Sequence, residues 1–407
     1  MDESARVRVR HLFVTQDYAP DLGGMARRHL ELCRRFGDGE DTTMAVSTVA
    51  APGAKSFDDS EPYAIYRQPF AFNRANRFAN QMRWAAWLAS PKGARFEVLH
   101  CGNIRPVGYA VSAVHLLRKK PYLLYVNGGD LLRERKKTAE SAAKRASARK
   151  ILADAAGIVA TSEWVAELSR EVLSLVGVRN APPVAALGLG TDPVQFNPRR
   201  DTGALRRRWG VEDSFVMLTV ARLVPHKGQD MGIRALAVLK HQFPDLRYIL
   251  IGEGHDETRL RDLARELDVE DRVGFVGPMR DDELPEAYAT ADLYLGPSRI
   301  DREINAEGYG IAFLEAAASG IPSVAGDSGG VRSAVRDDET GILVPPENVD
   351  AIASAVRTLL VDEELRLKMG AAGRRAVETY YNWERVARDT REFTYRVIGG
   401  GGTGVAS

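Results

Sequence analysis

The sequence predicts an α/β protein made of two doubly wound domains, with a ligand cleft between their strand ends. Length is the first reason, because 407 residues can bury two separate hydrophobic cores. Rhythm is the second, because apolar runs alternate with helical patterns through residues 7–198 and start again after a polar linker at 199–203. Composition is the third: 44% hydrophobic and 27% charged residues are typical of a soluble globular chain.

The first half alternates strands and helices. Apolar runs predict strands at 7–15, 45–48, 64–67, 122–126, 151–160 and 184–187, and a strand with its loop at 98–103. Helical patterns cover about 25–36, 73–90, a segment ending near 118, and a segment beginning at 163 after the cap Thr161-Ser162. Aromatic and arginine side chains alternate in 73–90, which favours core packing over an interfacial membrane helix.

The second half repeats the pattern. Strands are predicted at 215–221, 247–252, 272–276, 291–298, 323–325 and 342–344. Helices follow the first two of these strands, to about residues 243 and 267, and three more are expected at about 349–360, 363–378 and 382–397. Residues 399–407 are expected to form a flexible tail.

The stretch 307–320 organises the second half. Residues 311–318 are almost wholly apolar, which predicts a buried helix that ends at Gly320 before Pro322. Glu315 lies inside this segment, where an unpaired carboxylate would be costly, so a polar partner or ligand is required. One interpretation is a structural carboxylate paired with a buried Arg. The other is a ligand site.

The start of this helix is suited to an anion. Gly308 and Gly310 allow backbone N–H groups to approach a ligand closely, and a helix N-terminus attracts negative charge. Glu307 precedes Glu315 by eight residues, a helical rise of ~12 Å. That distance would span from the sugar to the ribose of a nucleotide sugar.

Two other loops follow predicted strands. Gly23 and Gly24 come after the first strand and would make a phosphate-sized cradle, although most glycine pairs are only turns. Arg222 and Lys227 follow the strand at 215–221 and could neutralise a diphosphate, or they could be solvated surface cations.

Two of these motifs resemble a known family. Glu307-Gly-Tyr-Gly-Ile followed by Glu315 is similar to the E-x7-E signature of the retaining nucleotide-sugar glycosyltransferases of family 4, which have the GT-B fold. Arg222-Leu-Val-x-x-Lys227-Gly is similar to the diphosphate-binding loop of that family. The similarity is tight over 215–346, including segments 297–298, 326–330 and 341–346, and loose over 1–200. It is greatest to the mannosyltransferases that act on phosphatidylinositol.

The sequence departs from the family pattern at two places. Asn127 stands where the family usually has a His near the reacting sugar carbon, and His100 is the nearest alternative. An amide can still hydrogen-bond a sugar hydroxyl. Arg332-Ser333 stands where Pro-Glu is common, which leaves the donor motifs intact.

The resemblance implies a set of roles. Arg222, Lys227, Glu307 and Asn127 are the expected catalytic residues, with Asn127 and Asp130 on the acceptor side. The expected donor-binding residues are Gly23, Gly24, Arg222, Lys227, Gly308, Tyr309, Gly310, Ile311 and Glu315. No Asp-x-Asp follows a strand, so no metal and no other cofactor is expected.

The resemblance also sets the predicted domains and reaction. An acceptor-binding domain is expected at 1–198, a donor-binding domain at 199–381, and a helix at 382–398 that crosses back to the first domain. The predicted reaction moves mannose from GDP-mannose to a hydroxyl of a lipid-linked or glycan acceptor. The alternatives are a UDP-sugar-dependent glucosyl- or N-acetylglucosaminyltransferase and a GT-B sugar-nucleotide epimerase. An oxidoreductase is disfavoured, because Glu257 occupies the third glycine position of its fingerprint after Gly252 and Gly254.

The distribution of charge and the cysteine content indicate which partners the protein binds and where in the cell it acts. Residues 1–200 hold 30 Lys and Arg against 20 Asp and Glu, whereas the remainder holds 26 against 35. The basic half, above all the run at 131–150, suits an anionic membrane surface or acceptor, or it simply attracts the acidic half. Two cysteines give no disulfide framework, and no apolar stretch has transmembrane length, so we expect a cytoplasmic enzyme with peripheral membrane contact and no nucleic-acid partner.

Overall fold

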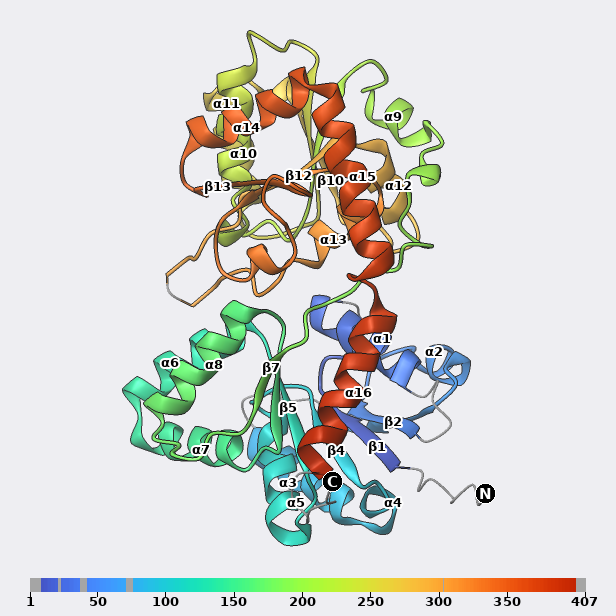
Figure 1. The fold of residues 1–407 in the computed structure, drawn as a ribbon, viewed down its shortest axis with the longest axis vertical. Coiled ribbons are helices and arrows are strands. Elements are labelled where there is room, and N and C mark those ends of the chain that lie inside the picture. Colours follow the sequence, from blue (N-terminus) through green and yellow to red (C-terminus); the bar gives the residue numbers. More distant parts are fainter. Residues whose placement is uncertain (1–8, 21–22, 37–41, 71–75, 303, 400–407) are drawn as a thin grey trace, which may run out of the picture. The chain divides into compact units, whose positions relative to one another are not determined.

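The computed structural model describes residues 9–20, 23–36, 42–70, 76–302 and 304–399. The chain forms two compact units, which we call unit 1 (Met1–Leu187 with Trp383–Ser407) and unit 2 (Gly188–Asn382) (Figure 1). The sequence analysis placed the end of the first domain at residue 198. The donor-binding domain at 199–381, the crossing helix at 382–398 and the tail at 399–407 remain predictions. Residues 7–8 of the first predicted strand, residues 73–75 of the helix predicted at 73–90, and the tail 400–407 lie outside the described residues.

Unit 1 contains a parallel sheet with the strand order β3-β2-β1-β4-β5-β6-β7. Its strands are β1 (Val9–Val14), β2 (Thr42–Val49), β3 (Ala64–Gln68), β4 (Val98–Cys101), β5 (Tyr122–Val126), β6 (Gly157–Ala160) and β7 (Val184–Ala186). The central strands β4, β5 and β6 are wholly buried, as expected of a sheet that is covered on both faces. The order reverses direction at β1, which is typical of a doubly wound sheet.

The helices of unit 1 connect successive strands. They are α1 (Gly24–Phe36), α2 (Lys55–Ser60), α3 (Arg77–Ala89), α4 (Pro91–Ala94), α5 (Val107–Arg118), α6 (Gly128–Glu140), α7 (Ala142–Ala153), α8 (Glu163–Leu175) and α16 (Trp383–Gly399). The last helix, α16, packs against α1 and β6 (Figure 1). It buries Trp383 and Phe393, so the end of the described chain completes the core of unit 1.

One predicted strand of unit 1 was wrong in extent. Residues 151–160 were expected to form one strand, but 151–153 end α7 and only Gly157–Ala160 form β6. The apolar Ile151 and Leu152 belong to the buried face of a helix, which an apolar run alone cannot distinguish from a strand. The basic run 131–150 is split at Ser141, whose Oγ accepts the Lys144 N–H and caps α7.

Helix α3 answers the question about its aromatic side chains only in part. Trp84 is fully buried and its Nε1 donates to Ser47 Oγ over 2.9 Å, so one face packs as expected. Phe78 and Met82 remain 76% and 52% exposed. The opposite face therefore keeps an apolar surface that core packing does not explain.

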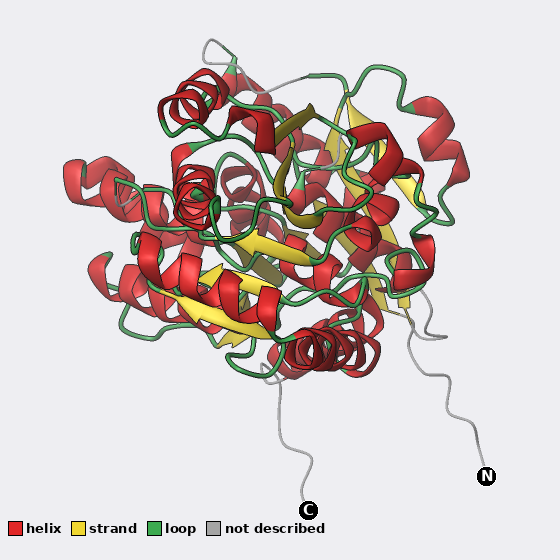
Figure 2. Cartoon of the chain, turned by 90° about the horizontal axis from the view of Figure 1, so that it is seen from above, coloured by secondary structure: helices red, strands yellow, loops and turns green. Residues whose placement is uncertain are grey.

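Unit 2 contains a second parallel sheet with the strand order β10-β9-β8-β11-β12-β13. Its strands are β8 (Phe215–Val220), β9 (Leu246–Ile251), β10 (Val273–Gly277), β11 (Leu293–Gly296), β12 (Ser323–Gly326) and β13 (Gly341–Val344). Its α-helices are α9 (Ala204–Trp209), α10 (Gln229–Leu239), α11 (Glu257–Glu266), α12 (Leu284–Thr290), α13 (Ile311–Ala318), α14 (Val349–Val361) and α15 (Glu363–Thr379). Its short 3-10 turns are η1 (Pro198–Arg200), η2 (Pro225–Lys227), η3 (Glu270–Arg272) and η4 (Val331–Ser333). The fold prediction of two doubly wound units is confirmed. Figure 2 shows the chain from above, with helices around the strands.

Within the described ranges, no helix has both the length and the apolar character needed to cross a bilayer.

Candidate functional site

The site in unit 2 lies where β8 and β11 end. The chain leaves β8 through the short turn η2, which contains Lys227, and Glu307 lies in the loop that leads to α13. The Lys227 ammonium donates to Glu307 Oε2, and the two side chains are only 20% and 16% exposed. Residues 80 positions apart are thus joined by an ion pair at the carboxyl end of the sheet.

The Lys227 charge decides the ionisation of Glu307. Burial alone would raise the pKa of Glu307, but the charge and hydrogen bond of Lys227 outweigh it and hold that pKa below its usual value. His226 lies next to the pair, and burial together with the Lys227 charge lowers its pKa to about 4. At neutral pH this corner therefore holds an ammonium, a carboxylate and a neutral imidazole.

The glycines around Glu307 fix its backbone. Gly310 has φ +94°, a left-handed conformation, and an added Cβ would lie 2.4 Å from Phe313 Cδ2. The Gly330 N–H donates to the Glu307 carbonyl over 2.8 Å, and a Cβ on Gly329 would lie 2.4 Å from the same carbonyl oxygen. The glycine pair 329–330 therefore allows a close approach that holds Glu307 in place.

Arg222 is the second predicted cation, and it is exposed. Its carbonyl accepts a hydrogen bond from Gln229 Nε2 over 2.9 Å, which fixes the backbone of the loop. Within the described part of the chain, no ion pair or hydrogen bond involves its guanidinium. Gly228, which follows Lys227, has φ +76° and would clash with Pro297 O at 2.1 Å if it carried a Cβ.

Glu315 lies inside α13 and is 6% exposed. Tyr288, on α12, donates its hydroxyl to Glu315 Oε2 over 2.7 Å. The sequence required a polar partner for this carboxylate and suggested a buried Arg; a Tyr hydroxyl is found at this oxygen. Sequence reasoning missed Tyr288 because α12 was not predicted. The only signal was that a buried Glu315 requires a polar partner.

In unit 1, Asn127 and Asp130 are bonded to each other at the end of β5. Asn127 caps α6: its Oδ1 accepts the Asp130 N–H over 3.1 Å, and its Nδ2 donates to Asp130 Oδ2 over 2.8 Å. The same Nδ2 lies 2.6 Å from Met25 Sδ in the first turn of α1. This contact brings the cap of α6 next to the helix that begins at Gly24.

The Gly23–Gly24 loop is open in unit 1. A Cβ added to either glycine would meet no atom within 4 Å, so packing inside the described chain does not require glycine there. Nearby, Asn103 Nδ2 donates to Asp17 Oδ2 over 3.1 Å. Burial raises the pKa of Asp17, and the Asp130 charge adds to the rise. Asn103 was not singled out as a site residue, because a single Asn after a strand gives no signal.

His100, the alternative to Asn127, is fully buried inside the sheet. Its Nδ1 lies 2.8 Å from the Tyr125 hydroxyl and its Nε2 lies 3.0 Å from His11 Nδ1. Both ring nitrogens are therefore engaged in the core, which makes His100 a structural residue.

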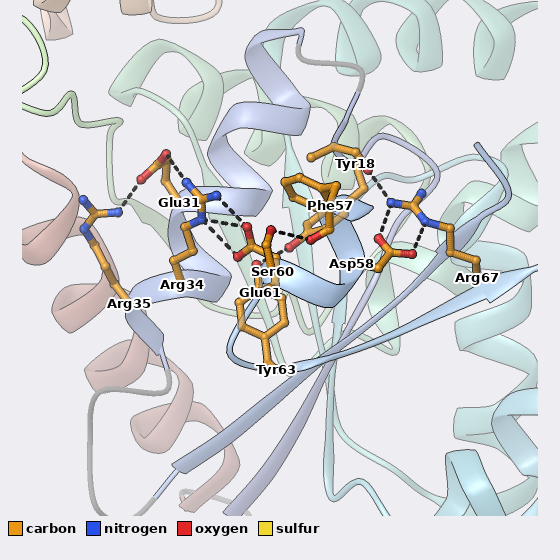
Figure 3. A network of polar contacts seen from close by, with 11 residues as sticks. Tyr18, Glu31, Arg34, Arg35, Phe57, Asp58, Ser60, Glu61, Tyr63 and Arg67 are labelled. Atoms are coloured by element: carbon orange, nitrogen blue, oxygen red, sulfur yellow. Dashed lines mark hydrogen bonds and ion pairs between the residues drawn. The ribbon is translucent and has the colours of Figure 1, made fainter. Parts of the chain in front are cut away.

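A polar network supports the loop before Gly23 (Figure 3). Arg67 donates to both carboxylate oxygens of Asp58 over 2.8 Å and to the Ala19 carbonyl over 2.6 Å. The hydroxyls of Tyr18 and Tyr63 lie 2.6 Å apart. These contacts tie residues 18–19 to α2 and β3, and the sequence alone did not show them.

Comparisons with known proteins address the whole chain. Residues 22–178 match the model of Glycosyltransferase Family 4, and residues 201–376 match that of Glycosyl transferases group 1. A GDP-mannose-dependent alpha-(1-6)-phosphatidylinositol monomannoside mannosyltransferase of Mycobacterium tuberculosis is 30% identical over 390 residues, covering 94% of this chain and 97% of the relative. A D-inositol 3-phosphate glycosyltransferase of Kineococcus radiotolerans is 33% identical, covering 62% of this chain and 61% of the relative.

The fold is shared with a solved glycosyltransferase structure. The crystal structure of Anabaena HepE in complex with UDP and glucose superposes with a TM-score of 0.74 at 20% identity, covering 95% of this chain and 99% of that one. At that identity the likeness concerns the fold alone. Family models over both halves and a full-length relative show the family: the chain is a glycosyltransferase of family 4 with the GT-B fold, an enzyme that transfers a hexose from a nucleotide sugar.

Proposed function

We propose that the protein transfers mannose from GDP-mannose to a hydroxyl of a lipid-linked or glycan acceptor, with retention of the anomeric configuration. The donor is suggested by the mannosyltransferase from Mycobacterium tuberculosis, which is similar over 94% of this chain. The observation that carries the proposal is the Lys227–Glu307 pair at the glycine-rich start of α13. This pair puts one cation and one carboxylate beside a helix N-terminus.

Lys227 and Arg222 are proposed to stabilise the leaving diphosphate. An ammonium has three donors, so Lys227 can keep its bond to Glu307 and still donate to phosphate oxygens. The Arg222 guanidinium is exposed and has five donors in a planar fork that suits phosphate. The backbone N–H groups at Gly308–Ile311 add partial positive charge at the start of α13.

The two glutamates are proposed to hold the two ends of the donor. Glu307 stays ionised because Lys227 lowers its pKa, and an ionised carboxylate accepts hydrogen bonds from sugar hydroxyls. Glu315 accepts from Tyr288, and since a carboxylate has about four acceptor sites, it can also accept ribose hydroxyls. Tyr309 and Ile311 would line the donor between them.

The proposed chemical step takes place on one face of the sugar. The acceptor oxygen bonds to the anomeric carbon as the bond from that carbon to the diphosphate oxygen breaks, and the acceptor proton passes to the departing diphosphate. The atoms balance with nucleoside diphosphate as the second product. A covalent route would need a carboxylate nucleophile, and Asp17 and Asp130 are each engaged in hydrogen bonds. Proton NMR of the first-formed product tests this step, because an inverted linkage would refute it.

Unit 1 is proposed to supply the acceptor side. Asn127 and Asp130 would contact the acceptor or sugar hydroxyls, and Gly23 and Gly24 would let the backbone approach the donor. We further propose a cytoplasmic enzyme in which the basic unit 1 contacts the membrane surface, and a reaction that needs no metal. Activity that is lost in EDTA and restored by a divalent cation would refute the metal-independent proposal.

The decisive experiment compares nucleotides and donors. Calorimetry with GDP, UDP and ADP should show the tightest binding for GDP, and turnover of GDP-mannose should release GDP. Preference for UDP would favour the alternative, a UDP-sugar-dependent glucosyl- or N-acetylglucosaminyltransferase. Product that remains attached to the nucleotide would indicate an epimerase.

A further inference from the structure

Unit 1 contains a groove whose lining residues are not among those proposed for the reaction. It encloses about 960 Å³ between α7, α8 and the loop that enters β7. Three arginines line it, namely Arg149, Arg170 and Arg179, and the described lining contains no Asp or Glu. Ser174 and Asn180 add a hydroxyl and an amide. The groove therefore offers many donors and positive charge.

The three guanidiniums have no partner among the residues that the structure describes. Within the described ranges, none of them takes part in an ion pair or hydrogen bond. Glu171, the acid next to Arg170 in sequence, is paired with Arg135 over 3.2 Å. A purely structural explanation is that the arginines neutralise the partial negative charge at the carboxyl ends of α7 and α8. Arginines in that role commonly hydrogen-bond the last carbonyls of a helix, and no such bond is found here.

The groove lies at the edge of the sheet opposite Asn127. Its loop residues precede β7, and Ala153 precedes β6, so the groove is at the amino-terminal edge of a parallel sheet. Asn127 follows β5 at the carboxyl-terminal edge. The four residues of β6 separate these edges by about 13 Å. The groove is thus separate from the acceptor-side residues.

We propose that this groove binds a phosphate-bearing ligand, either the headgroup of an anionic lipid or a soluble phosphorylated molecule. Guanidinium groups donate paired hydrogen bonds to phosphate oxygens, and three of them can surround one headgroup. The volume also accommodates the organic group attached to the phosphate. The carboxyl ends of α7 and α8 carry partial negative charge and repel an anion in the groove. The affinity for phosphate therefore depends on the arginines and should fall steeply as the salt concentration rises.

The test compares two charge-matched variants at low and high salt. The groove variant is R149S/R170S/R179S, and the control is K55S/K92S/K119S, which removes three exposed cations of unit 1 that lie outside the groove and outside the run 131–150. Sedimentation uses vesicles of phosphatidylcholine with or without an anionic phospholipid, and calorimetry uses pyrophosphate. All three proteins keep Arg222 and Lys227, so any difference between them reports on the groove and not on the donor site.

We expect the groove variant to bind one probe on the order of a hundredfold more weakly than the wild type, since each cation near an anionic surface contributes roughly fivefold. The control should lose much less. Loss on vesicles alone identifies a lipid headgroup, and loss with pyrophosphate identifies a soluble phosphate ligand. The variant R149K/R170K/R179K, which keeps the charge, should retain most of the binding.

Three results would overturn the proposal. They are equal binding by the wild type and the groove variant, no binding of either probe by the wild type, and an equal loss in the control. If the triple variant melts at a lower temperature, the three single substitutions carry the same test. Failure of GDP-mannose turnover would not affect this result, because the groove is measured without a donor.

Discussion

The core of unit 1 and the candidate site of unit 2 hold polar side chains in different protonation states. Unit 1 buries three neutral imidazoles in its core, those of His11, His29 and His100, and burial lowers the pKa of each. Unit 2 instead keeps a charged pair, Lys227–Glu307, partly buried where its strands end. The comparison shows that a doubly wound sheet can accommodate neutral polar side chains in its interior and an ion pair at its carboxyl edge.

The candidate-site pairs of the two units also differ. Asn127 and Asp130 are three residues apart and form a helix cap, which stabilises α6 whether or not a ligand binds. Lys227 and Glu307 are 80 residues apart, and no local secondary structure needs their bond. A long-range ion pair that serves no local element is the better candidate for chemistry.

The largest expected difference between the units is their response to acid. The folded pKa is about 4 for His11, about 3 for His29 and well below 6.5 for His100, so the unfolded state binds more protons as the pH falls below 6.5. Stability is therefore full above pH 6.5 and declines below it, by up to about 1.4 kcal/mol per pH unit for each imidazole. In unit 2, burial and the Lys227 charge lower the pKa of His226 to about 4.

Hydrogen exchange at pH 7 and pH 5, corrected for the intrinsic rates, measures this response. Unit 1 should lose protection first. The raised pKa of Asp17 works in the opposite direction, but it is one group against three. Earlier loss of protection in unit 2 would show that the buried imidazoles do not control acid stability.

The next effect concerns the charged pair. Lys227→Ala removes the cation that we propose stabilises the leaving group and leaves Glu307 partly buried without it. The barrier to transfer should therefore rise by about 3 kcal/mol, a roughly hundredfold loss of turnover. Steady-state kinetics with GDP-mannose gives the value. Lys240→Ala is the control, since Lys240 also forms an ion pair in unit 2, with Asp268. Unchanged turnover in Lys227→Ala would remove Lys227 from the catalytic residues.

A smaller effect is expected at Glu315, which is proposed to hold the donor and not to stabilise the transition state. Glu315→Ala should raise the apparent donor binding constant by roughly tenfold or more, the value of one or two hydrogen bonds to a charged group. Tyr288→Phe removes the bond to Oε2 but keeps the carboxylate, so it should weaken binding less. Calorimetry with GDP distinguishes the two variants, and intact binding in both would make this carboxylate structural.

The smallest effect is expected in the network of Figure 3. Arg67→Ala removes the hydrogen bond to the Ala19 carbonyl and frees the loop before Gly23. A lost hydrogen bond costs about 1 kcal/mol, so kcat/KM should fall several-fold. Arg35→Ala is the control, because Arg35 pairs with Glu31 and Glu384 in the same unit and has no bond to residues 18–20. An equal change in both variants would reduce the effect to general stability.

The sequence predicted most of the fold, because apolar runs of the right length mark buried parallel strands directly. It erred at 151–160, where the buried face of a helix and a strand follow each other with only a short break. The motif residues of unit 2 were found because glycine and charge occur together at strand ends. The partner of Glu315 and the bond between Arg67 and Ala19 were not, because each joins elements that lie apart along the chain. Which residue meets a buried carboxylate depends on packing that no local pattern records.

Helix α16 has a consequence for how the protein is made. Its 17 residues cover β1 and β6: the ring of Tyr395 lies 5.9 Å from that of His11, and a Cβ on Gly157 would lie 2.9 Å from Phe393. Because the chain is synthesised from its amino terminus, all of unit 2 leaves the ribosome before α16 is available to complete the core of unit 1. The second unit to be synthesised can be the first to finish folding. A released chain that ended before Trp383 would contain every element of unit 2 but a unit 1 whose β1 and β6 lack their cover.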